Sequence, residues 1–307
     1  MRLGVLDIGS NTIHSLVVDA HHGAAPIPAH KFKKELRLAQ YADEKGFISQ
    51  PAIDSLVEFI TQSQQIAEDL GVERTIAFAT SAIRDAPNRD SLVTEIEQRT
   101  SIHVDLLSGE TEAELTFLAA RRWVGWSAGR LMLLDIGGGS LEIAIGDDEE
   151  PDIAVSVPIG AGVMTRQFIT SDPAEADDIR ALRKHVRAQI ASVAGSVLKG
   201  ASPRVVVGTS KTFKQLARIA GAAESGAGIY IDRQLSREDL MAIVGELTPM
   251  TDSERRKISG VSAGRSPQML AGALVAQAAL DLLNVDTVHI GPWALREGVI
   301  LRTLDSM

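Results

Sequence analysis

The chain contains no cysteine among its 307 residues, which excludes disulfides, thiolate catalysis and cysteine zinc sites. It has no apolar run near the roughly 18–20 residues that a membrane-spanning helix needs. Its N-terminus lacks the layout of a signal peptide. The seven histidines show no metal-binding spacing. These absences predict a cytoplasmic protein that does not contact a membrane.

Basic residues are fewer than acidic ones, since the chain has 31 Lys and Arg against 40 Asp and Glu and a net charge of −9. Such a balance disfavours nucleic acid as a partner. A polyanionic ligand would have to be held locally, by backbone N–H groups, a metal ion and a few basic side chains. The hydrophobic content of 45% supports a substantial core, and the length suggests about two domains of roughly 100–200 residues.

Strand-like apolar runs alternate with helical periodicity along the chain, which predicts an α/β fold. Strands are expected over 3–6, 15–18, 75–79, 131–134, 141–145 and 204–207, and helices over 51–70, 90–98 and 174–198.

A short sequence motif occurs once in each half of the chain. Asp7-Ile8-Gly9 recurs 128 positions later as Asp135-Ile136-Gly137, each time between two strand-like runs. Repeated supersecondary units indicate duplicated domains, so we expect one copy in each domain. Coincidence is the alternative, since three matching residues arise easily.

One glycine-containing segment is a candidate for holding phosphate on its residues alone. Gly137–Ser140 would let backbone N–H groups converge on phosphate oxygens, and Ser140 adds a hydroxyl. A tight hairpin turn is the alternative for this segment. Gly208–Thr212 resembles a P-loop only superficially, because Ser210 stands where that motif needs glycine.

Carboxylates stand close to the expected strand ends. Asp7 and Asp135 each stand where a strand gives way to a turn, and Glu142 lies two residues beyond Ser140. Mg²⁺ prefers oxygen ligands and bridges to substrate phosphates, so these acids predict a magnesium site. The alternative is that each acid only stabilises its turn.

Glu112 stands at an expected helix start, where acids are favoured by the helix dipole. Helical spacing places Glu112 on the face of Leu115 and Ala119, and places Glu110 on the face of Glu114. Glu112 is therefore expected to face the interior or a cleft, where burial would raise its pKa and let it take a proton from water.

Six segments together resemble the exopolyphosphatase and guanosine pentaphosphate phosphatase (Ppx/GppA) family, in its short two-domain form. They are DIGSNTIHSLVV, ATSAIRDAPN, SGETEAEL, LLDIGGGSLEIAIG, VVVGTSKTF and PWALREGVI, in family order from residue 6 to 300. The resemblance implies two actin-like (ribonuclease H-like) domains of the sugar kinase/Hsp70/actin superfamily, with the active site in a cleft between them. The expected domains are 1–120, completed by a C-terminal helix over 295–307, and 121–294.

The resemblance also assigns roles. It implies that Glu112 is the general base and that Asp135 and Glu142 bind Mg²⁺. It implies that phosphate is bound by Asp7, Gly9, Ser10, Asn11, Arg84, Gly137, Gly138, Gly139, Ser140 and the third loop, which consists of Gly208, Thr209, Ser210 and Lys211. Three departures from the family pattern bear on substrate choice, namely Thr111, Lys211 and Arg265-Ser266-Pro267.

The implied activity is Mg²⁺-dependent release of terminal orthophosphate from inorganic polyphosphate. Hydrolysis of guanosine pentaphosphate is the nearest alternative. A kinase of the same fold is less favoured, because Glu112 suits activation of water. A non-catalytic phosphate or nucleotide sensor is an alternative of another class. A homodimer stays open, since the sequence does not fix the oligomeric state.

Overall fold

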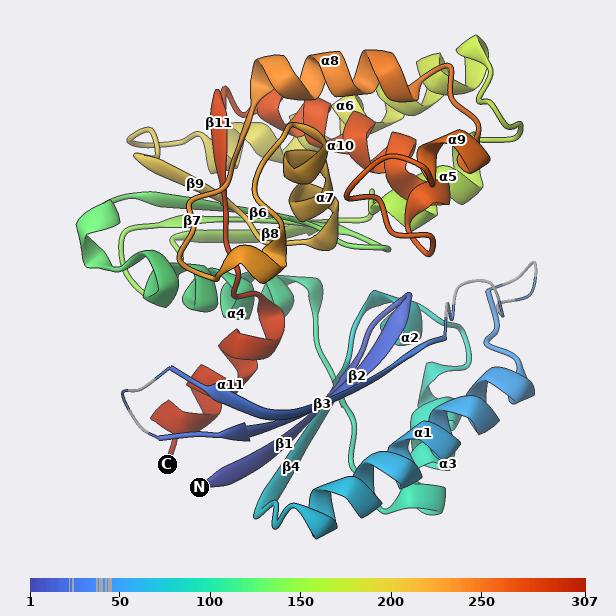
Figure 1. Cartoon of the computed structure of the whole chain (residues 1–307), viewed down its shortest axis with the longest axis vertical. Coiled ribbons are helices and arrows are strands. Elements are labelled where there is room, and N and C mark those ends of the chain that lie inside the picture. Colours follow the sequence, from blue (N-terminus) through green and yellow to red (C-terminus); the bar gives the residue numbers. More distant parts are fainter. Residues whose placement is uncertain (22, 24, 37, 39–40, 42, 44–45) are drawn as a thin grey trace. The chain divides into compact units, whose positions relative to one another are not determined.

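The computed structural model describes residues 1–21, 23, 25–36, 38, 41, 43 and 46–307. The chain divides into two compact units, Met1–Ser108 with Val299–Met307, and Gly109–Gly298. Each unit is built on one β-sheet (Figure 1).

The first unit holds a five-stranded sheet in the order β3-β2-β1-β4-β5. Its elements are β1 (Arg2–Ile8), β2 (Thr12–Asp19), β3 (Ile27–Glu35), α1 (Gln50–Asp69), β4 (Arg74–Ala79), α2 (Ser81–Arg84), α3 (Arg89–Thr100) and β5 (Asp105–Leu106). The first three strands are antiparallel neighbours, whereas β4 runs parallel to β1 and to β5. The C-terminal part of α11 (Leu295–Asp305) belongs to this unit.

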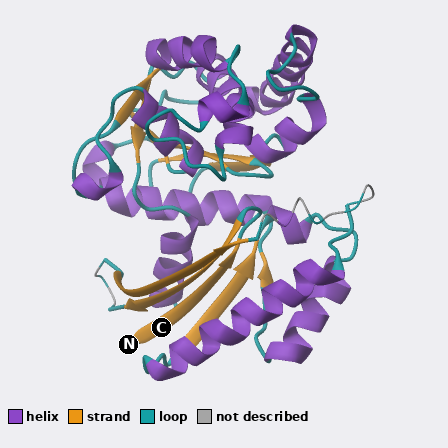
Figure 2. Cartoon of the chain, turned by 45° about the vertical axis from the view of Figure 1, so that its right-hand side comes forward, coloured by secondary structure: helices purple, strands orange, loops and turns teal. Residues whose placement is uncertain are grey.

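One face of this sheet is covered by α1 and α3, as Figure 2 shows for the long α1. Pro51 lies in the first turn of α1, where its missing N–H has no helical partner to lose. The helix buries an apolar stripe that includes Ile53, Leu56 and Ile60. These side chains pack with strand residues such as Ile8, so the expected helix and its inward face are confirmed.

The second unit holds a six-stranded sheet in the order β10-β11-β9-β6-β7-β8. Its elements are α4 (Gly109–Val124), η2 (Trp126–Ala128), β6 (Leu131–Ile136), β7 (Leu141–Gly146), β8 (Ile153–Val157), α5 (Ala161–Phe168), α6 (Ala176–Val197), β9 (Val205–Gly208), α7 (Lys211–Ile219), η3 (Ser225–Ala227), β10 (Gln234–Ser236), α8 (Arg237–Leu247), α9 (Asp252–Arg255), η4 (Ser266–Gln268), α10 (Met269–Leu282), β11 (Thr287–Ile290) and the start of α11.

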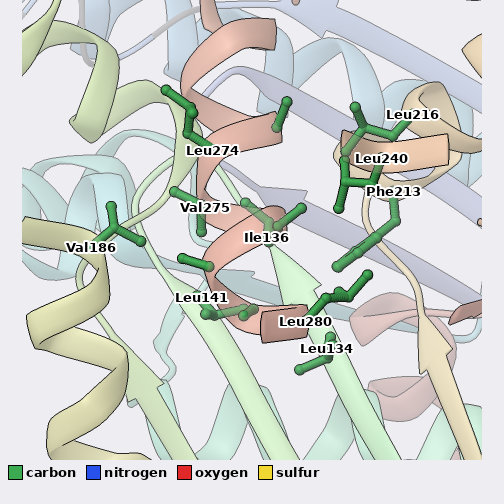
Figure 3. Close-up of a cluster of buried hydrophobic side chains, with 14 of the residues drawn as sticks. Leu134, Ile136, Leu141, Val186, Phe213, Leu216, Leu240, Leu274, Val275 and Leu280 are labelled. Carbon is green, nitrogen blue, oxygen red and sulfur yellow. The ribbon is translucent and has the colours of Figure 1, made fainter. Parts of the chain in front are cut away.

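Side chains on the two faces of the second sheet enter different layers, because successive residues of a strand point to opposite sides. Leu134, Ile136 and Leu141 join the large core under α6, α7, α8 and α10, and Figure 3 shows them gathered around Leu280 of α10. Leu133 and its neighbours pack against α4 through Phe117. Figure 1 shows α4 on one side of this sheet and α6, α8 and α10 on the other.

The two sheets repeat one topology. Three antiparallel strands (β3-β2-β1 and β8-β7-β6) are extended by parallel strands (β4-β5 and β9-β11). This is the actin-like arrangement that the family resemblance implied. Each unit holds one copy of the repeated Asp-Ile-Gly motif, and both copies end the first strand of a hairpin.

The boundary between the units falls after Ser108, whereas the sequence placed it at residue 120. The cause is α4, which packs on β6, β7 and β8 of the second sheet. The start of α11 also lies against α4. A Cβ on Gly298 would lie 1.9 Å from the carbonyl oxygen of Leu115, so only glycine allows this crossing.

Candidate active site

Two carboxylates lie side by side at one end of the second sheet. Asp135 of β6 is directly opposite Glu142 of β7 in the antiparallel register. Side chains at such positions project from the same face with their Cβ atoms about 4.5–5.5 Å apart. That face is the one covered by α4. Leu133, two residues before Asp135, and Ala144, two residues after Glu142, project from the same face and pack against α4.

The carbonyl groups of the turn between these strands fix it to the start of α5 by hydrogen bonds. The carbonyl of Gly137 accepts from the N–H of Ala161 (3.0 Å), that of Gly138 from Gly162 (2.9 Å) and Val163 (3.0 Å), and that of Gly139 from Gly160 (3.0 Å). The first N–H groups of α5, which lack partners within the helix, are thereby satisfied. The turn cannot rotate its peptide planes without breaking these bonds.

The other side of the turn offers donors. The N–H of Gly137 closes the turn on the carbonyl of Ser140 (2.9 Å), but no hydrogen bond within the described part of the chain uses the N–H of Gly138, Gly139 or Ser140. Successive unpaired N–H groups of this kind form a concave anion site. The hairpin turn expected as one alternative is confirmed, and its geometry is compatible with the phosphate loop, which stays a prediction.

Both carboxylates are held by hydroxyl groups. Thr209 Oγ1, just beyond the end of β9, donates to Asp135 Oδ2. Ser156 Oγ on β8 donates to Glu142 Oε1 at 2.8 Å. Burial raises the pKa of Asp135 above its ordinary value, while the Thr209 hydroxyl and the positive charges of Lys214 and Arg265 oppose this rise. The fold thus holds a carboxylate that is poorly solvated when it is charged.

This pair fits a magnesium ion that also binds substrate. Mg²⁺ is usually held by one or two carboxylates plus substrate phosphates and water, rather than by an all-protein cage. Asp135 and Glu142 supply two carboxylates beside the open N–H groups of the turn. No group of three or more Asp, Glu, His or Cys side chains able to hold a metal occurs among the described residues. A site here would therefore need phosphate or water oxygens to complete its ligand set.

Glu112 lies in the first turn of α4 and is only 7% exposed, whereas Glu110 is exposed. The inward direction expected from helical spacing is confirmed. The helix start passes close to β8, since a Cβ on Gly109 would lie 2.4 Å from Cβ of Ser156. Ser156 is the residue that holds Glu142. Glu112 thus belongs to the helix turn that lies against the carboxylate end of the sheet.

The first unit carries the matching hairpin. Gly9 N–H donates to the carbonyl of Thr12 (3.2 Å), as Gly137 does to Ser140 in the second unit. Asp7 is opposite His14, where the second unit pairs Asp135 with Glu142. The first copy therefore presents one carboxylate beside an imidazole, and the second copy presents two carboxylates.

The other first-unit candidates are Ser10 and Asn11 of this turn, and Arg84 of α2. The hydroxyls of Ser10 and Ser81 lie 3.1 Å apart, and the carbonyl of Asn11 accepts from the N–H of Leu36 at 3.1 Å. Arg84 donates to Asp85 (2.9 Å) and to the carbonyl of Leu107 (3.0 Å), with its side chain 18% exposed. A phosphate on Arg84 would have to share the guanidinium with these partners. The cleft between the domains stays a prediction.

The third loop divides into residues with different tasks. Gly208 is required by packing, because a Cβ there would lie 2.7 Å from Val288 Cγ1 and 2.8 Å from Phe213 Cγ. Ser210 caps α7 by accepting from the N–H of Phe213 at 3.3 Å. Thr209 holds Asp135, and Lys211 is exposed.

Comparison with known proteins agrees with this arrangement. Residues 16–307 match the sequence model of the Ppx/GppA phosphatase family. The chain belongs to the Ppx/GppA phosphatase family. Its similarity to Exopolyphosphatase 1 of Mycobacterium tuberculosis is 48% identity over 306 residues, covering 100% of this chain and 89% of that protein. Exopolyphosphatase 1 of Mycobacterium leprae is 46% identical over 306 residues, with 100% and 90% covered.

Solved structures of family members share the fold. An exopolyphosphatase from Cytophaga hutchinsonii superposes with a TM-score of 0.88 at 26% identity, over 100% of this chain and 99% of that one. The Ppx/GppA family member from Aquifex aeolicus gives a TM-score of 0.84 at 21% identity, over 100% and 98%. No helix among the described residues is long and apolar enough to cross a membrane.

The sequence did not point to the residues that support the candidate site on the α5 side of its turn. Gly160 is the clearest example, because a Cβ on it would lie 2.4 Å from the backbone of Gly139 and Ser140. Its φ of −62° is open to any residue, so glycine is needed for the close approach alone. Ser156 and Lys214 were also missed. The pair Gly160 and Gly162 at a helix start was the one visible signal.

We expect Gly160→Ala to destabilise the protein by about 1–3 kcal/mol, the usual cost of overpacking, and to disorder the turn that it supports. Urea unfolding followed by circular dichroism measures the first effect. Gly195→Ala is the matched control, because Gly195 is exposed in α6 with nothing within 4 Å of a new Cβ. Equal stabilities of the two variants would contradict the packing argument.

We expect Asp135→Asn to be more stable than the wild type at neutral pH without Mg²⁺. A raised pKa means that Asp135 stabilises the fold only when it is protonated, and this stability is lost as pH rises through the folded pKa. Asparagine carries no charge to desolvate. Added Mg²⁺ should raise the unfolding temperature of the wild type more than that of the variant, since a ligand of the native state stabilises it.

Thermal unfolding with and without Mg²⁺ checks this expectation, with Asp148→Asn as a control that removes an exposed charge. An Asp135→Asn protein less stable than the wild type without Mg²⁺ would show that desolvation does not dominate at this position.

Proposed function

We propose that this chain is an exopolyphosphatase that releases terminal orthophosphate from inorganic polyphosphate. The observation that carries the proposal is the turn over residues 137–140, whose unpaired N–H groups lie beside the paired carboxylates Asp135 and Glu142. Relatives named exopolyphosphatase at 46–48% identity over the full chain support it.

The turn would bind the terminal phosphoryl group. The N–H groups of Gly138, Gly139 and Ser140 would donate to its oxygens, and their positions are fixed in advance by the bonds to α5. Donors that need no rearrangement stabilise developing charge at little cost. Local binding of this kind also explains how a chain with a net charge of −9 could take a polyanion.

Asp135 and Glu142 would hold the Mg²⁺. When bound, the ion would neutralise charge on the phosphate oxygens that face the two carboxylates. The Thr209 and Ser156 hydroxyls keep both side chains oriented toward one face of the sheet. The desolvation that raises the pKa of Asp135 would be relieved by a cation, so the empty and the bound protein should differ in stability.

Glu112 would orient a water molecule and accept its proton. The water oxygen attacks the terminal phosphorus in line, and the bond from that phosphorus to the bridging oxygen breaks. Orthophosphate and a chain one unit shorter leave, and the proton passes from Glu112 to solvent. Phosphoryl transfer depends mainly on such positioning and charge stabilisation, and burial of Glu112 restricts its motion.

The first unit and the third loop would add further phosphate contacts. The family resemblance assigns such contacts to Asp7, Gly9, Ser10, Asn11 and Arg84 of the first unit and to Gly208, Thr209, Ser210 and Lys211 of the second, and they stay predictions. Thr209 acts there through Asp135, and Gly208 through packing. A cytoplasmic location is proposed from the sequence.

We expect Glu112→Gln to lower the rate of orthophosphate release by about 10²–10⁴-fold, the usual contribution of a general base, with substrate binding largely retained. Release from short and long polyphosphate, with and without Mg²⁺, measures the rate, and calorimetry measures binding. Glu110→Gln is the control, because Glu110 begins the same helix and is exposed. A Glu112→Gln enzyme as fast as the wild type would refute the assignment of the base.

The same assay separates the alternatives. Faster release from guanosine pentaphosphate than from polyphosphate would favour the nucleotide as substrate. Tight binding of polyphosphate without any Mg²⁺-dependent release would favour a sensor.

A further inference from the structure

Ser156 lies in the same row of residues as the two carboxylates of the candidate active site. Asp135 is opposite Glu142 in the register of β6 and β7, and Glu142 is opposite Ser156 in the register of β7 and β8. Residues opposite one another in antiparallel strands project from the same face of a sheet. Ala154, two residues before Ser156, packs against the cluster that α4 forms with this sheet. The Ser156 side chain therefore points toward α4.

The hydrogen bond from Ser156 restricts a rotation that a glutamate otherwise keeps. The last torsion of a glutamate side chain, which rotates its carboxylate group, has only broad preferences. Burial holds the stem of Glu142, since 4% of the residue is exposed. Ser156 Oγ donates to Glu142 Oε1 at 2.8 Å. This bond favours one orientation of the carboxylate over the others.

The same serine is the residue against which α4 begins. Gly109 is the first residue of α4, and a Cβ on it would lie 2.4 Å from Cβ and 2.6 Å from Oγ of Ser156. Rotation of the hydroxyl could relieve the second contact. It could not relieve the first, because the strand backbone fixes the position of the Ser156 Cβ. The start of α4 thus lies so close to β8 that only glycine fits.

Glu112, the proposed general base, belongs to this helix start. It lies in the first turn of α4, three residues after Gly109. Backbone hydrogen bonds join residues four apart in a helix, so one turn moves as a unit. The contact between Gly109 and Ser156 therefore also sets where Glu112 lies relative to Glu142.

We propose that Ser156 is a positioning residue that sets the metal preference of the site and the separation between its metal ligand and its base. The inference rests on the proposed function. Mg²⁺ demands near-ideal octahedral geometry with oxygens at about 2.0–2.1 Å, whereas Ca²⁺ accepts oxygens at about 2.3–2.6 Å in flexible arrangements. A carboxylate held in one orientation favours the ion with the stricter geometry, so loss of the Ser156 hydroxyl weakens Mg²⁺ binding more than Ca²⁺ binding.

Ser156→Ala tests the hydroxyl, because it keeps the Cβ that meets Gly109 and removes only the donor to Glu142. We expect the Kd for Mg²⁺ to rise about tenfold or more, the usual effect of losing a partner of a metal ligand, and the Kd for Ca²⁺ to rise less. Titration of the full-length protein with each ion alone, by calorimetry and by thermal unfolding, measures both constants. At saturating Mg²⁺ the kcat for orthophosphate release should return to near the wild-type value. Ser192→Ala removes an exposed hydroxyl of α6 and should change neither Kd.

Gly109→Ala tests the separation. The new Cβ must push the start of α4 away from β8, so we expect kcat to fall about tenfold or more even at saturating Mg²⁺, since a misplacement of about 1 Å can cost roughly 100-fold in rate. Adding Ser156→Gly to this variant removes the atoms that the new Cβ meets. The double variant should regain kcat at saturating Mg²⁺ while its Kd for Mg²⁺ stays raised. Gly245→Ala is the control, because Gly245 is exposed in α8 with nothing within 4 Å of a new Cβ.

The outcomes separate this inference from the proposed function. A wild type that binds Mg²⁺ but releases no orthophosphate would refute the proposed function, and the two Kd values would still decide the metal preference. Equal Mg²⁺ affinity in the wild type and Ser156→Ala, or an equal loss of Mg²⁺ and Ca²⁺ affinity, would overturn the inference alone. So would a double variant as slow as Gly109→Ala. A wild type that does not respond to Mg²⁺ would overturn the metal site and this inference together.

Discussion

The candidate active site depends on a set of backbone hydrogen bonds between one hairpin turn and one helix start. The carbonyls of Gly137, Gly138 and Gly139 accept from the first N–H groups around α5. These bonds satisfy the helix start and, by fixing the peptide planes, direct the opposite N–H groups of the turn outward. They require two backbones to approach so closely that only glycine fits at Gly160.

The two sheets repeat one topology, and small differences between their hairpins favour different chemistry in each. Both hairpins place an Asp at the end of the first strand and a glycine N–H at the turn. The residue opposite the Asp is His14 in one copy and Glu142 in the other. A hard divalent cation prefers paired carboxylates, so the second copy suits metal binding better than the first.

The chemistry proposed for this site opposes the stability of the folded protein without its ligands. Asp135 is held where burial disfavours its charge, and the opposing groups do not remove the rise in its pKa. A bound cation would offset the charge that burial disfavours on Asp135. Ligand-binding sites commonly contain strained or poorly solvated groups, which lower the stability of the unliganded protein.

The sequence by itself determined the strands β1, β2, β4, β6, β7 and β9, the long helices α1, α3 and α6, the repeated hairpin and the inward direction of Glu112, whereas β3, β5, β8, β10 and β11 were not predicted. These features follow from local periodicity and turn chemistry, which depend on neighbouring residues. The family resemblance was also visible in six short segments, and the family is confirmed over residues 16–307.

Tertiary structure decided the rest. α10 is buried on nearly all sides, so it lacks the one-sided pattern that makes a surface helix readable. The grouping of α4 with the second sheet, the contact of Gly160 with the turn, and the hydroxyls that hold Asp135 and Glu142 all join residues far apart in the chain. Such pairings are set by how the layers pack, and no local pattern of residues encodes that packing.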